Sequence, residues 1–182
     1  MKVSVFILFA ITILFTTSCN RVKTIENIRL LDSLKNVLDT ISKNQEEINF
    51  TGIQLRNDTF KTDMDSIAKY VTKIPTNKKH YEHFTLYTGL RHDFKRFNKI
   101  NLTKDLQYSK KQILTLKEDV YRNSITKEQF YEYITTEQEA ISLLKKQSDK
   151  QLFESEKILT YFEKSRPIIV EIIDSSKAVY SK

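Results

Sequence analysis

The chain has 182 residues and a formal net charge of +7, from 30 lysine and arginine residues and 23 aspartate and glutamate residues. Its two glycines, two prolines and one cysteine exclude a disulfide within the chain and a glycine-rich phosphate loop, and they disfavour folds with many tight turns. After the first 20 residues, apolar side chains recur at helical spacing among lysine, glutamate and glutamine, so we expect an all-α fold.

The N-terminal 19 residues form a segment of different composition. Lys2 precedes an apolar run from Val3 to Phe15, interrupted only by Ser4 and Thr12. This run has the length of a signal-peptide core and is too short to span a bilayer as a helix, which needs about 20 residues. Three small polar residues then lead to Cys19, the one cysteine of the chain.

The end of this segment resembles the lipobox of bacterial lipoproteins, where a small residue precedes a cysteine that becomes lipidated. The resemblance implies a signal peptide over residues 1–18 and a mature chain that begins at a lipidated Cys19. Thr16 departs from the pattern, which usually has an aliphatic residue there. Asn20 stands in place of the aspartate associated with inner-membrane retention, which implies the periplasmic face of the outer membrane if the cell has two membranes. One alternative is an ordinary secretory signal that leaves Cys19 as a free thiol. The other is a buried core segment, which would have to pack this run without amphipathic periodicity.

A first helix is predicted to start almost directly after Cys19, and from Leu31 it carries a coiled-coil-like apolar seam. Its members lie at gaps of three, four and seven residues: Leu31, Leu34, Leu38, Ile41, Ile48 and Leu55. Gln45 and Gly52 weaken the seam, so we expect a break between Asn49 and Thr59, with a new N-cap at residues 57–59. The seam can be covered within the chain or by a second copy, which leaves a homo-oligomer open.

Two further helices follow Pro75, which ends the first stripe because its ring cannot continue a helix. The second is expected to begin at Thr76 or Asn77 and carries a largely aromatic stripe of Phe84, Tyr87, Leu90 or Arg91, Phe94 and Phe97. The third, capped by Asn101 or Thr103, is expected to reach about Tyr121 and to bury Leu106, Ile113, Leu116 and Val120.

The last helix begins at the clearest turn of the sequence. Thr126 and Gln129 have the spacing of a capping box, which predicts a short turn and an antiparallel hairpin. The apolar stripe that follows consists of Phe130, Ile134, Ile141, Leu144, Leu152, Leu159 and Phe162. Pro167 either kinks this helix or starts a short fifth one. The sequence thus predicts one domain over residues 19–182, an elongated antiparallel bundle of about four to five helices.

The positive charge is concentrated in the middle of the chain. Residues 77–116 carry nine basic and three acidic side chains, whereas residues 20–76 carry nine and eight, and residues 117–182 carry eleven and twelve. The candidate ligand-binding residues of the predicted helix 77–99 are Lys78, Lys79, Arg91, Lys95, Arg96 and Lys99. They predict an anionic partner, such as a lipid headgroup or an acidic polysaccharide, or a solvated basic face over an aromatic core.

The sequence predicts no catalytic residue, no metal site and no cofactor. His80 and His83 lie one helical turn apart, but two ligands do not make a metal site, and His92 lies on another side of the helix. Lipidation of Cys19 would remove its thiol as a nucleophile. We therefore expect a non-catalytic lipoprotein of the cell envelope that serves as a structural or adaptor module and docks an envelope protein. The first alternative is an anion-binding module, and the second is a helical-bundle enzyme or metal protein. Export across a membrane argues against nucleic acid as a ligand.

Overall fold

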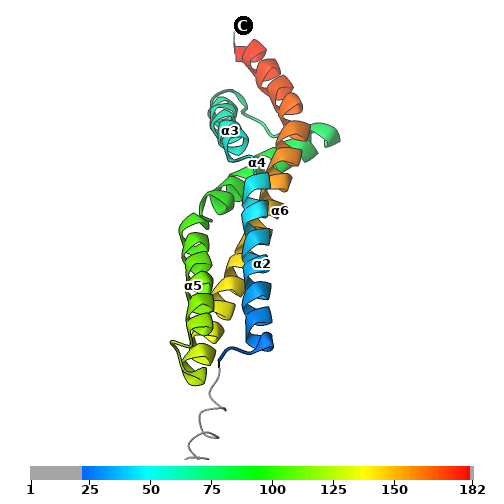
Figure 1. The fold of residues 1–182 in the computed structure, drawn as a ribbon. Helices are drawn as coiled ribbons and strands as arrows, with labels where there is room; N and C mark the ends of the chain where they lie inside the picture. Colours follow the sequence, from blue (N-terminus) through cyan, green and yellow to red (C-terminus); the bar gives the residue numbers. More distant parts are fainter. Residues whose placement is uncertain (1–21, 181–182) are drawn as a thin grey trace, which may run out of the picture. The chain divides into compact units, whose positions relative to one another are not determined.

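The computed structural model describes residues 22–180, which form five helices (Figure 1). They are α2 (Ile25–Glu47), α3 (Phe50–Tyr70), α4 (Lys78–Asn98), α5 (Thr103–Arg122) and α6 (Lys127–Tyr180). Since these residues contain no strand, the predicted all-α helical bundle is confirmed. The predicted signal peptide and Cys19 lie outside the described residues. Among the described helices, none has both the length and the apolarity to cross a membrane.

The chain divides into two compact units. Among the described residues, unit 1 comprises residues 22–42 and Leu102–Lys146, and unit 2 comprises Lys43–Asn101 and residues 147–180. The helices of unit 1 are therefore most of α2, all of α5 and the first part of α6. Unit 2 contains α3, α4 and the remainder of α6.

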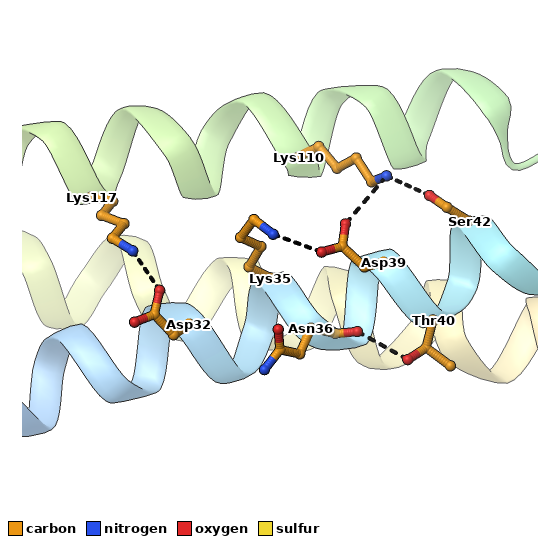
Figure 2. Close-up of polar contacts among 8 residues, drawn as sticks. All are labelled: Asp32, Lys35, Asn36, Asp39, Thr40, Ser42, Lys110 and Lys117. Carbon is orange, nitrogen blue, oxygen red and sulfur yellow. Dashed lines mark hydrogen bonds and ion pairs between the residues drawn. The ribbon is translucent and has the colours of Figure 1, made fainter.

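Polar contacts between α2 and α5 fix the direction of these helices in unit 1 (Figure 2). Lys117 Nζ donates to Asp32 Oδ1 at 2.5 Å, and Lys110 Nζ lies 3.6 Å from Asp39 Oδ1 and 2.5 Å from Ser42 Oγ. Lys110 and Lys117 are seven residues apart, about two helical turns, and so are Asp32 and Asp39. The later lysine pairs with the earlier aspartate, and the earlier lysine with the later aspartate. The helices are therefore antiparallel.

The first half of the predicted seam packs into the apolar core of unit 1 through Leu31, Leu38 and Ile41. These residues are therefore buried by the chain's own helices. The buried members of this core are Val22, Leu31, Leu38, Ile41, Leu102, Leu106, Ile113, Leu116, Val120, Phe130, Ile134, Ile141 and Leu144. The expected burial of the third helix is thus confirmed at all four positions. Leu55 was wrongly placed on the seam, because its side chain is 67% exposed. The chain break before α3 resets the helical phase, which turns Leu55 outward.

Side-chain caps set most helix starts. A break was predicted between residues 49 and 59, and it occurs at the start of this range. Asn49 caps α3 there by accepting a hydrogen bond from the Gly52 N–H at 2.8 Å. The N-cap expected at residues 57–59 is therefore wrong, and Asn57 is buried inside α3. A Cβ on Gly52 would lie 2.6 Å from the Asn49 side chain, so a glycine suits this cap.

The other predicted caps give a mixed outcome. Asn77 caps α4, and the Thr126–Gln129 capping box forms as predicted, with bonds of 2.9 and 3.3 Å. The α5 prediction is wrong, since the cap position is occupied by Leu102, an apolar residue that is buried instead. α6 continues through Pro167 as a single helix, so the alternative in which a separate short helix begins at Pro167 is wrong.

In unit 2, α4 and α6 pack antiparallel along the whole length of α4. His80 lies 3.7 Å from Glu171, Asp93 accepts from Lys157 at 2.9 Å, and the Ile100 carbonyl accepts from Gln151 at 3.0 Å. As the residue number increases along α4, the number of its contact residue on α6 decreases, so the two helices run in opposite directions. The core between them includes the predicted aromatic stripe, with Tyr87, Leu90, Phe94 and Phe97 all buried.

A buried carboxylate links three helices of unit 2. The Tyr87 hydroxyl of α4 donates to Asp63 Oδ2 of α3 at 2.6 Å, and Arg166 Nε of α6 donates to the same oxygen at 3.0 Å. Burial, and then the bond to Asp63, raises the pKa of Tyr87, so this hydroxyl stays protonated and remains a donor. The two hydrogen bonds from Tyr87 and Arg166 compensate the desolvation cost of burying the Asp63 carboxylate.

We predict that Tyr87→Phe destabilises the protein by about 1.5–3 kcal/mol, because Asp63 loses a hydrogen bond to a buried charge while the ring is retained. Urea unfolding of the purified protein measures the change. Tyr108→Phe is the matched control, because the Tyr108 side chain is 60% exposed. Equal unfolding midpoints for the two variants would contradict this role of Tyr87.

Candidate functional site

The structure separates the six predicted basic residues into different places on α4. Lys78 and Lys79 lie in the first turn, Lys99 is the C-cap residue, and Arg91 and Lys95 lie one turn apart near the C-terminal end. Lys78 and Arg91 are 13 residues apart, about 20 Å along the helix axis. All six are exposed, but they do not form one patch.

Arg96 is engaged in an ion-pair network within unit 2. Its guanidinium contacts Asp93, one turn earlier, and its Nε lies 3.0 Å from Glu154 Oε1 on α6. Lys157 Nζ pairs with the same Asp93 at 2.9 Å. Because Asp93 and Glu154 are both buried, Arg96 neutralises internal charge and is less available to an external ligand.

Arg91 and Lys95 line a groove between α3 and α4 that we call the basic groove. Lys61 of α3 is the third cation at its wall, and Phe60, Met64 and Phe94 supply apolar surface. The groove has a volume of about 370 Å³ and is also lined by Asn57, Asp65 and Asn98. Sequence reasoning missed Lys61, although its position between Phe60 and Met64, one helical turn apart, places it beside the buried stripe.

Unit 1 contains a groove of opposite charge between α5 and α6, the tyrosine groove. It has a volume of about 520 Å³ and is lined by Tyr108, Gln112, Thr115, Leu116, Asp119, Glu132, Tyr133, Thr136 and Glu137. The side chains of Tyr108 and Tyr133 are 60% and 48% exposed. Three of these lining residues, all in the described part of the chain, are acidic and none is basic.

Glu137 is the half-buried carboxylate of the tyrosine groove. Burial raises its pKa above the usual 4.5, although a hydrogen bond with the buried Ser109 acts in the opposite direction. Its Oε2 atom is inaccessible to solvent and has no hydrogen-bond partner among the described residues. A cationic donor that enters the groove would compensate this charge. Sequence reasoning missed the groove, because only the pairing of α5 with α6 brings Tyr108 and Glu137 together.

The histidines of α4 make separate contacts with α6. His83 Nδ1 lies 3.2 Å from Ser165 Oγ, and His80 lies near Glu171. His92 is exposed. Over residues 22–180, no three histidine, cysteine or acidic side chains are grouped closely enough to hold a metal ion.

We predict that Glu137→Gln raises the melting temperature at about pH 8. Since the folded-state pKa of Glu137 is raised, its ionised form destabilises the fold above that pKa, and its protonated form does not. The difference from wild type should therefore vanish as the pH falls below 4.5. Glu139→Gln, at an exposed position of the same helix, is the control. A pH-independent difference, or an equal effect of Glu139→Gln, would contradict the prediction.

The chain thus presents two grooves of opposite charge, one in each unit. No protein-family model, curated protein or solved structure matches this chain. Its function has to be inferred from its own residues and geometry.

Proposed function

We propose that this protein is a lipoprotein of the cell envelope, anchored by a lipid on Cys19, that acts as a non-catalytic adaptor and docks a partner protein. The observation that carries the adaptor role is the tyrosine groove of unit 1. The envelope location, on the periplasmic face of the outer membrane if there are two membranes, rests on the lipobox resemblance.

The packing of the first described residues supports a short tether. Val22 is 1% exposed, and its carbonyl accepts from the Asn27 side chain at 2.7 Å. The Lys23 ammonium lies 4.9 Å from the centre of the Tyr121 ring. The three residues from Cys19 to Val22 span at most about 10 Å. A lipid on Cys19 would therefore keep unit 1 close to the membrane surface.

The tyrosine groove has the chemistry of a protein-docking site. Tyrosine is enriched at the energetic centres of interfaces, because it combines a large apolar ring with a hydroxyl. Asp119, Glu132 and Glu137 complement a positive charge, and the rings of Tyr108 and Tyr133 can contact a cation through their faces. We propose that the partner presents a lysine or arginine side chain to this groove.

We predict that a photoreactive phenylalanine analogue at Tyr133 forms one discrete adduct with another protein in intact cells. Glu137→Lys should lower the adduct yield at least severalfold, because it places a like charge opposite the basic partner. Cys19→Ser should also lower the yield, because the protein loses its position at the membrane. Denaturing gels and mass spectrometry measure the adduct.

The matched control places the same analogue at Tyr81, which is 51% exposed and lies on α4, outside the groove. Similar adducts from both positions would contradict a docking site in the tyrosine groove. Yields unaffected by Glu137→Lys would contradict recognition of a basic side chain.

A second candidate function is the binding of an anionic envelope ligand, such as a lipid headgroup or an acidic polysaccharide. The observation that favours it is the basic groove, where Lys61 of α3 joins Arg91 and Lys95 of α4. Asp58 accepts from Lys61 at 2.9 Å, so part of that charge is compensated locally. Arg91 and Lys95 are therefore the principal ligand-binding residues of this proposal.

We predict salt-sensitive binding of the protein to vesicles that contain phosphatidylglycerol. Replacing Arg91 and Lys95 by Gln should weaken binding about tenfold or more, since each cation near an anionic surface contributes about 1 kcal/mol. Replacing Lys78 and Lys79 by Gln removes the same charge from the other end of α4 and is the control. Equal losses from both pairs would show general charge attraction and contradict a specific groove.

A further inference from the structure

The basic groove is one end of a longer face along α3 and α4. A second groove, which we call the apolar groove, is lined by Phe50, Thr51, Gln54, Leu55, Phe97 and Asn98 and has a volume of about 560 Å³. Asn98 lines both grooves, so the two adjoin. On α3 the linings run from Phe50 to Asp65, which corresponds to about 22 Å of helix.

The two halves of this face differ in chemistry. The apolar groove exposes Leu55 at 67% and Phe50 at 43%, and the Phe50 ring lies 5.6 Å from that of Phe97. The basic groove carries Lys61, Arg91 and Lys95. None of the residues that line the apolar groove, all of them in the described part of the chain, is charged. The face is therefore amphiphilic along its length.

We propose that this face binds a single-chain anionic lipid, with its headgroup at Lys61, Arg91 and Lys95 and its acyl chain along Phe50, Leu55 and Phe97. The inference rests on the second candidate function and specifies its ligand. A polysaccharide would use the cations but would leave the apolar groove exposed to water. Lys61 and Phe50 are 11 residues apart on α3, about 16 Å along the helix axis, which an extended acyl chain of about 14 carbons would span, and its binding would remove the apolar groove from water.

Photolabelling of the lipidated protein in phosphatidylcholine nanodiscs tests the inference. Three probes carry the same photoreactive group: a single-chain lipid with a phosphate headgroup, the same lipid with a neutral glycerol headgroup, and a water-soluble phosphate without a chain. We expect the anionic lipid to label peptides within residues 50–65 and 91–98 most strongly. Peptide mass spectrometry locates and quantifies the adducts.

The variants separate the two halves of the face. Leu55→Gln should lower labelling by the anionic lipid about three- to tenfold, because it removes apolar contact with the chain. Leu114→Gln, at a 53% exposed leucine of α5, should leave labelling unchanged. Replacing Arg91 and Lys95 by Gln should lower labelling by the anionic lipid to the level of the neutral one.

Two results would overturn the inference in distinguishable ways. Equal labelling of the basic groove by the chainless phosphate and the anionic lipid, unaffected by Leu55→Gln, would leave an anion site without a chain groove. Equal labelling by the neutral and anionic lipids, unaffected by the Arg91 and Lys95 replacements, would also contradict the second candidate function.

Discussion

The constraint on which unit 2 depends is the burial of charged groups between its helices. Asp63 on α3 and Asp93 on α4 are both buried and ionisable, so each needs hydrogen-bond donors, and each obtains at least one from a neighbouring helix. Asp63 obtains them from Tyr87 and Arg166, and Asp93 from Arg96 and Lys157. A shift of α3, α4 or α6 by a single turn would remove at least one of these inter-helix donors from a buried carboxylate. These contacts therefore fix the register of the helices whose outer surfaces form the basic and apolar grooves.

This arrangement explains how the basic residues divide their roles. Arg96 forms ion pairs with the buried Asp93 and Glu154, whereas Arg91 and Lys95 line the basic groove between α3 and α4. In unit 1 the ammonium groups of Lys110 and Lys117 contact acids and a hydroxyl of α2, so they join helices. The charge excess of residues 77–116 is thus partly structural, and only part of it remains for a ligand. The tyrosine groove of unit 1 is lined by three acidic residues, so the two grooves would suit ligands of opposite charge.

Local chemistry predicted the helices well. The Asn77 cap, the Thr126–Gln129 capping box and the aromatic stripe of α4 depend on residues within one or two turns of each other, and all three are confirmed. Leu55 was predicted wrongly because the helical phase is reset at Asn49, at the start of the predicted range, and the α5 cap was predicted wrongly because Leu102 is buried by tertiary packing. Lys61 and the tyrosine groove were missed for the same reason. Their residues are distant in sequence, and single-sequence periodicity does not indicate which helices pair.

The functional account begins at Cys19, because lipidation would place the protein at a membrane and bring both grooves to envelope partners. The most direct measurement is the mass of the N-terminal peptide of the protein purified from its own cells. The account predicts a peptide that begins at Cys19 and carries a lipid in thioether linkage on its sulfur. A chain that still begins at Met1, or a mature chain in which Cys19 is a free thiol, would contradict it.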